Sequence, residues 1–196
     1  MPRRHPPSRH RTGSVALGVI LVALIGAIVV VASHPLSDAE ALRRLEARAI
    51  AIPVTQAGYH APISTDRYHD AQRLSRITVR VLGATIAYTK DGMPGDLDGM
   101  AVPSARMITI NPSLAWDARF QVLAHEAAHV IQPSTLATSE AEVFADAVSY
   151  LTGRRYGYDD LETIARYLAS HKQALSVLRV YATEISWAAL VLTGPE

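Results

Sequence analysis

Residues 123–132, "LAHEAAHVIQ", decide how this sequence is interpreted, because they carry two histidines four residues apart and a glutamate directly after the first. On an α-helix, positions four residues apart lie on one face, with Cβ atoms about 6 Å apart. His125 and His129 can therefore each direct a ring nitrogen at the same point. Glu126 lies about 100° further round such a helix, within reach of a water molecule held at that point.

This H-E-x-x-H spacing is typical of zinc sites that activate water. The two histidines would bind zinc, the metal would lower the pKa of a water molecule, and Glu126 would accept its proton. The alternative is an alanine-rich core helix in which one histidine is hydrogen-bonded and the other lies at the rim. A catalytic zinc needs a third protein ligand, so the rest of the chain must decide between these interpretations.

A third ligand is expected from the helix predicted over residues 138–153. No third histidine follows at the H-x-x-G-x-x-H spacing, but Glu142 and Asp146 lie one turn apart with Ala145 between them. We predict that Glu142 is the third ligand. Asp146 would then accept a hydrogen bond from a ligating histidine and fix its tautomer. Small Ala145 would let the two helices approach closely.

Two alternatives to these roles stay open. Glu142 also stands three residues after Ser139, so it could be a capping-box glutamate, and Glu140 would then be the fallback ligand. Asp146 could be an ordinary solvated surface residue.

The N-terminal 33 residues differ from the rest of the chain. Residues 1–13 contain four arginines and no acid, and residues 14–33 carry no charge. The apolar core of the second segment, residues 15–32, would span about 27 Å as a helix, close to the hydrocarbon thickness of a bilayer. We predict a membrane anchor with the N-terminus in the cytoplasm and the domain outside. A cleaved signal peptide is the alternative, since residues 30–32 (Val-Val-Ala) fit a small-residue cleavage site.

Composition excludes several classes of function. The chain has no cysteine, so disulfides and thiolate metal sites are excluded and a transition metal would have only His and carboxylate ligands. The formal net charge of +1 includes the N-terminal arginines, so residues 34–196 are acidic. No basic stripe with interleaved aromatic residues is present, and we expect no nucleic-acid partner.

The pattern of the remaining chain predicts an α+β fold with a small antiparallel sheet and a helical C-terminal half. Helices are expected over residues 37–51, about 113–132, 138–153 and 171–192, and a further helix is expected to begin at residue 159 or 160. Residues 65–82 are ambiguous, because they fit a helix at first and a strand at their end. Short strands are expected at 84–89, 99–104 and 106–111. We divide the chain into a basic tail (1–13), an anchor or signal (14–33), a helix and linker (34–63) and a zincin-like domain (64–196).

Residues 106–133, "RMITINPSLAWDARFQVLAHEAAHVIQP", and 140–151, "EAEVFADAVSYL", resemble the core of the small gluzincin metallopeptidases, particularly the ImmA/IrrE-like group. In that group a strand of the type I-x-I-N leads into the H-E-x-x-H helix, and a helix with E-x-x-A-(D/N) follows. The resemblance covers about residues 75–155. It implies that His125, His129 and Glu142 bind zinc and that Glu126 is the general base.

The resemblance also implies that the strand at 106–110 is a sheet edge against which an extended peptide substrate could pair. Members of that group are usually cytosolic, whereas this chain has a predicted anchor. Partners of the group, such as transcriptional repressors, are therefore not carried over.

These features predict a membrane-anchored, zinc-dependent endopeptidase that acts on peptides or proteins. One rival is a non-catalytic anchored binding protein with a structural or vestigial zinc, and another is the same peptidase with its domain in the cytoplasm. The residue that stabilises the oxyanion is not identified, and the downstream candidates are Tyr150, Tyr156, Tyr158 and His171. His60 and His69 are expected in solvent, and the residues Trp116, Phe120 and Leu123 in the core.

Overall fold

The computed structural model describes residues 37–56, 67–95 and 97–194. From Asp38 onward these residues form one compact unit. The predicted anchor at 14–33 and His60 lie outside the described residues. In the part of the chain that the structure describes, none of the helices has both the length and the apolar character needed to cross a membrane.

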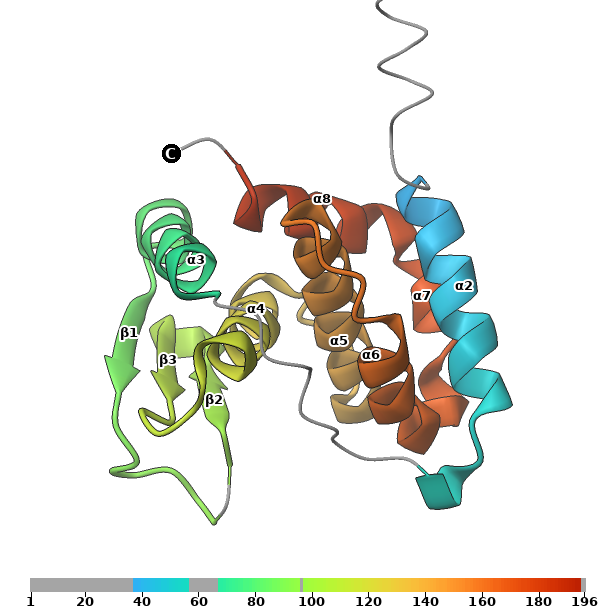
Figure 1. Ribbon diagram of the computed structural model, residues 1–196, viewed down its shortest axis with the longest axis horizontal. Coiled ribbons are helices and arrows are strands. Elements are labelled where there is room, and N and C mark those ends of the chain that lie inside the picture. The colour runs from blue at the N-terminus through green and yellow to red at the C-terminus, as the bar shows by residue number, and fades with distance from the viewer. Residues whose placement is uncertain (1–36, 57–66, 96, 195–196) are drawn as a thin grey trace, which may run out of the picture. The chain divides into compact units, whose positions relative to one another are not determined.

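Helices make up most of the described chain (Figure 1). The α-helices are α2 (Asp38–Ala51), α3 (Tyr68–Leu82), α4 (Trp116–Ile131), α5 (Thr138–Arg155), α6 (Leu161–Leu168), α7 (Val177–Val180) and α8 (Ala182–Leu192). Short 3-10 turns are η1 (Val54–Gln56), η2 (Pro103–Ala105) and η3 (Ala169–Ala174).

The sheet has three strands, β1 (Thr85–Tyr88), β2 (Gly99–Val102) and β3 (Met107–Ile110), in the order β1-β3-β2. β3 pairs parallel with β1 and antiparallel with β2. The central position suits β3, because Ile108 and Ile110 are fully buried while the residues of β1 and β2 are partly exposed.

The predicted fold class is therefore wrong. The described chain is mostly helical with a small mixed sheet, not an antiparallel one. The strand expected as an edge is the central strand, and β2 is the edge strand instead. Strand propensity located the strands, but the burial of β3 decided their order.

Residues 77–82, "ITVRVL", are helical although their alternation favours a strand. The buried residues of α3 recur every three or four positions, which is the period of one helix face: Ala71, Leu74, Ile77, Thr78 and Leu82. Gly83 then ends the helix in the left-handed conformation, with φ of 62°. Burial of one helix face thus outweighs the β-propensity of Val79 and Val81, which are exposed.

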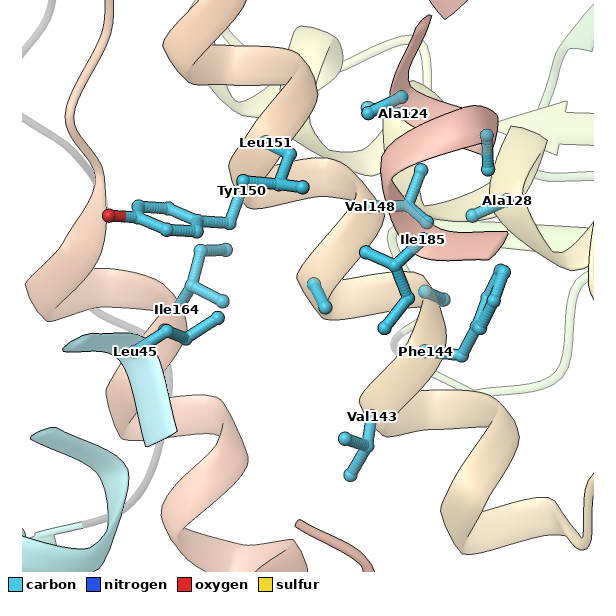
Figure 2. Close-up of a cluster of buried hydrophobic side chains, with 14 of the residues drawn as sticks. Leu45, Ala124, Ala128, Val143, Phe144, Val148, Tyr150, Leu151, Ile164 and Ile185 are labelled. Carbon is cyan, nitrogen blue, oxygen red and sulfur yellow. The ribbon is translucent and has the colours of Figure 1, made fainter. Parts of the chain in front are cut away.

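The core is built around α5, whose residues from Ala141 to Gly153 are nearly all buried. Figure 1 shows α4 between the sheet and α5, with α6 on the far side of α5. Ala124 and Ala128 of α4 belong to the same buried cluster as Phe144 and Val148 of α5 (Figure 2). The alanines of α4 are therefore the small residues that allow this close packing.

The long final helix expected over 171–192 is broken into η3, α7 and α8. His171 has non-helical backbone angles, with φ of −113° and ψ of 32°, and Tyr181 also leaves the helical region. All three pieces pack against α5. A straight helix would run past the core, whereas these breaks let each piece bury its apolar face on α5.

Candidate metal centre

The fold brings the predicted ligands of two helices together. His125 and His129 lie on the last turns of α4, and Glu142 lies on the first turns of α5. The Nε2 atoms of the two histidines are 3.0 Å apart. Glu142 places Oε2 at 3.3 Å from Nε2 of His125 and Oε1 at 3.6 Å from Nε2 of His129. These three side chains form a group that could hold a metal ion.

The distances can be compared with those of a small tetrahedral ion such as zinc. A zinc ion binds nitrogen and oxygen ligands at about 2.0–2.2 Å, so neighbouring ligand atoms in a tetrahedral site lie roughly 3.3–3.6 Å apart. The separations of 3.3 and 3.6 Å between carboxylate and imidazole atoms lie in that range, although they involve different oxygens of Glu142, and that of 3.0 Å between the imidazoles is slightly shorter. One ligand atom from each residue lies within 4.8 Å of the other two, so a rotation that brings one Glu142 oxygen toward both imidazoles would let the three residues share one ion.

The other nitrogen of each ring is held by a hydrogen bond. Asp146 Oδ1 lies 2.9 Å from Nδ1 of His125, and because a carboxylate only accepts, Nδ1 must carry the hydrogen. Gln132 Oε1 lies 2.8 Å from Nδ1 of His129 and accepts in the same way. In both rings Nε2 is therefore the nitrogen that faces the other ligands and would bind a metal, the arrangement expected of ligating histidines.

Asp146 thus lies where the sequence placed it, whereas Gln132 was missed. Asp146 is also buried, with 6% of its surface exposed, so the surface alternative for this residue is wrong. Gln132 follows His129 by three residues and is the C-cap residue of α4, so its side chain can turn back to the last turn of the helix. That spacing was the signal that could have identified it.

The two imidazoles differ in charge without a metal. Burial lowers the pKa of His125, but hydrogen bonds to Asp146 and Glu142 outweigh this effect and raise it to about 10. Burial and the charge on His125 lower the pKa of His129. The hydrogen bond from His125 lowers the pKa of Glu142. A metal ion binding here would therefore replace one proton held between the ligands.

Glu126 lies beside the three ligands and against β2. Only 8% of its surface is exposed, and this burial raises the pKa of its carboxyl group to about 7, against the opposing charge of His125. The backbone N–H of Ala101 donates a hydrogen bond to the carboxylate. Gly99 makes this approach possible, because a Cβ atom there would lie 2.4 Å from Val122 Cγ1 and 2.9 Å from Glu126 Oε1.

The cluster opens into a cleft of about 660 Å³. One wall is the edge strand β2 with the preceding residues Leu97 and Asp98, and the other is formed by α5, α6 and η3. His125, Glu126, His129, Glu142 and Asp146 all line it. A ligand in this cleft would reach the predicted metal site and Glu126 together.

The capping alternative for Glu142 is wrong. α5 begins at Thr138 after the N-cap residue Ala137, and the backbone N–H of Ala137 donates to Oε2 of Glu140 at 3.0 Å. Glu140, the fallback ligand, is therefore the capping glutamate. Because Glu142 lies two residues further on, its carboxylate faces the histidines instead.

These two glutamates provide a matched pair of variants. Glu142→Gln should weaken zinc binding at least about 100-fold, because a charged ligand becomes a neutral one. Glu140→Gln should leave zinc binding unchanged and lower the free energy of unfolding by about 0.5–1 kcal/mol through its cap. Isothermal titration calorimetry measures the zinc affinity of both variants, and thermal unfolding measures their stability. Equal zinc affinities in the two variants would contradict the ligand assignment.

Of the candidates for oxyanion stabilisation, His171 alone lines the cleft. The Tyr150 hydroxyl donates to Asp159 Oδ1, and that of Tyr158 donates to Asp70. Tyr156 packs against Phe120, with ring centroids 5.1 Å apart. Tyr167, which the sequence interpretation missed, also lines the cleft, one turn before His171.

The other residues considered lie away from the ligands. His69 is exposed, as predicted. Phe120 and Leu123 are fully buried, also as predicted, and Trp116 is half-buried beneath the guanidinium of Arg119, 3.9 Å from its ring centroid. None of these residues lines the cleft.

The function of this chain is inferred from the geometry of the His125–His129–Glu142 group and the cleft beside it. The resemblance to gluzincins rests on short motifs within residues 106–151. In comparisons with known proteins, no family model, no curated protein and no solved structure matched this chain.

Proposed function

We propose that this chain is a zinc-dependent endopeptidase of the gluzincin type. The observation that carries the proposal is the position of the three ligand atoms of His125, His129 and Glu142. One ligand atom from each of the three residues lies within 4.8 Å of the other two, at the side of an open cleft, with the Glu126 carboxylate beside them. Catalytic zinc sites commonly combine two histidines, one glutamate and an open fourth position.

Zinc is the ion that these donors favour. Two neutral imidazoles and one carboxylate suit zinc among the abundant divalent ions, whereas magnesium and calcium prefer sites made of oxygen ligands. The chain has no cysteine, whose thiolate would favour a softer metal. The hydrogen bonds of Asp146 and Gln132 would hold the two imidazoles in the ligating tautomer.

The bound ion would supply Lewis acidity to a water molecule and to the substrate carbonyl. Glu126 would accept a proton from the attacking water and pass it to the leaving amine, since its carboxylate is held beside the ligands by Ala101. Its burial against β2 limits the positions that the carboxylate can occupy. His171 and Tyr167 line the cleft and are the candidates for hydrogen bonds to the developing oxyanion.

An extended peptide would bind along β2, not along β3 as the resemblance implied. β2 is an edge strand and lines the cleft, whereas β3 is paired on both sides. The backbone groups of Met100 and Val102 face β3, and the N–H of Ala101 faces Glu126. A peptide added to this edge would pass directly beside Glu126; because the N–H of Ala101 already donates to that carboxylate, the peptide would pair with the other outward backbone groups of β2.

The location of the domain is proposed on the sequence alone. Arginines precede the uncharged residues 14–33, and no basic residue follows closely, which favours export of the domain either with or without cleavage of that segment. A reporter fused after Glu196 should therefore be active only outside the cytoplasm. A reporter active only inside would favour the rival with a cytoplasmic domain.

Chelation tests the proposal as a whole. The full-length chain, purified in mild detergent, should hydrolyse fluorescently labelled unfolded casein, lose that activity with a chelator, and regain it with one equivalent of zinc. A chain that binds zinc but cleaves neither casein nor a peptide library would favour the non-catalytic rival. A chain that binds no zinc would contradict both the enzyme and a zinc-binding role.

A further inference from the structure

Asp98 lies at the end of the cleft where the chain enters β2. Its backbone oxygen accepts a hydrogen bond from the N–H of Asn111 at 2.9 Å, and its Oδ1 accepts one from Asn111 Nδ2 at 3.2 Å. Asn111 is buried, and its own Oδ1 accepts from the N–H of Ser113 at 3.0 Å. That second bond fixes the amide orientation, so the Asp98 carboxylate is held in a defined position.

The Asp98 carboxylate forms no ion pair with a lysine, arginine or histidine within the described part of the chain. Asn111 occupies only one of its oxygens, and the residue is half-exposed to the cleft. This carboxylate is therefore oriented by the fold but free to bind a cation.

Most of the ionisable side chains that line the cleft, apart from its histidines, are acidic. The described lining includes four carboxylates, Asp98, Glu126, Glu142 and Asp146, and neither lysine nor arginine. A divalent ion on the ligands would offset only part of this charge. Since the low-dielectric walls of a cleft strengthen its potential, cationic side chains would be favoured and anionic ones disfavoured.

The position of Asp98 relative to Glu126 sets where a cation would bind. Gly99 and Ala101 flank the Glu126 carboxylate, and Asp98 precedes Gly99. A strand rises about 3.3 Å per residue, so Asp98 lies roughly 10 Å along β2 from Ala101. A peptide on the free edge of β2 would therefore bring a side chain to Asp98 within about three residues of the bond beside Glu126.

We propose that Asp98 determines substrate specificity, by selecting peptides with a lysine or arginine within three residues of the cleaved bond. The inference rests on the proposed peptidase function and deepens it by naming the substrate class. Asn111 acts as a positioning residue, because it orients the carboxylate without reaching the cleft. The asparagine that ends the I-x-I-N strand thereby gains a role that the sequence could not assign.

Cleavage-site profiling of a proteome-derived peptide library with the full-length chain tests the inference. Wild type should show lysine and arginine enriched at one position. For a matched pair of peptides with lysine or glutamine there, Asp98→Asn should lower kcat/KM about fivefold for the lysine peptide and little for the glutamine peptide. Asp98→Lys should shift the preference to glutamate. Asp91→Asn, in the exposed β1–β2 loop, is the matched control and should change neither peptide.

Two results would overturn the role of Asp98: a library profile without basic enrichment, or an enrichment that persists unchanged in Asp98→Asn. If wild type cleaves nothing, the peptidase function fails, and fluorescence anisotropy with the same two labelled peptides then decides about Asp98 separately. Tighter binding of the lysine peptide that is lost in Asp98→Asn would support the subsite. Equal binding of both peptides would reject it.

Discussion

The Glu126→Gln variant is expected to bind zinc as tightly as wild type and to hydrolyse peptides about 10²- to 10⁴-fold more slowly. Glutamine has nearly the same shape as glutamate but cannot accept a proton at neutral pH. The substitution also preserves an oxygen that can accept the hydrogen bond of the Ala101 N–H. Only the transfer of the proton should therefore be lost.

Zinc content by mass spectrometry and kcat on a labelled peptide, measured on the same preparation, separate the two effects. The melting temperature is the control for folding, and we expect it to stay the same or to rise, because the variant no longer buries a carboxylate. Hydrolysis at the wild-type rate by the zinc-loaded variant would disprove the role of Glu126 as general base. Loss of both zinc and activity would show that the carboxylate is needed for the metal site itself.

His129→Ala is expected to lose near-stoichiometric zinc. Its Nε2 lies 3.0 Å from that of His125 and 3.6 Å from Glu142 Oε1, so no other described side chain can take its place without moving. With two ligands left, zinc should dissociate during purification, whereas wild type should retain close to one ion per chain. Metal analysis of the purified proteins measures this directly.

His171→Ala is the matched control for this experiment. His171 lines the same cleft but does not belong to the His125–His129–Glu142 group, so zinc content should be unchanged in the variant. Loss of zinc from both variants to the same extent would contradict the assignment of the ligands. A wild-type chain without zinc would remove the basis of the proposed function altogether.

The local features of the site were predictable because they depend on a single helix. The spacing of His125 and His129 places both on one face of any α-helix, and the spacing of Glu142 and Asp146 does the same on the next helix. Both segments are helical, and the structure brings their four side chains together. The alanines between them are buried, as close packing of the helices requires.

The features that link distant segments were not predictable in this way. Four-residue strands carry too little pattern to fix their order, and the buried isoleucines of β3 decided it only when packed against α4. The choice between Glu140 and Glu142 depended on where α5 begins: the capping-box alternative placed the cap at Ser139, whereas the observed N-cap residue is Ala137. The break at His171 depended on the curvature of the core around α5.

The sequence by itself thus determined which side chains could share a metal, because helical periodicity is set by the backbone and needs no tertiary contact. Only the tertiary structure decided which glutamate faces the histidines and which strand forms the edge of the cleft. It also decided that Asp98 lies in the cleft, where no described lysine, arginine or histidine forms an ion pair with it. The physical reason is that these relations join residues far apart in the chain, and their geometry is set by the burial of α5 and β3 in one common core.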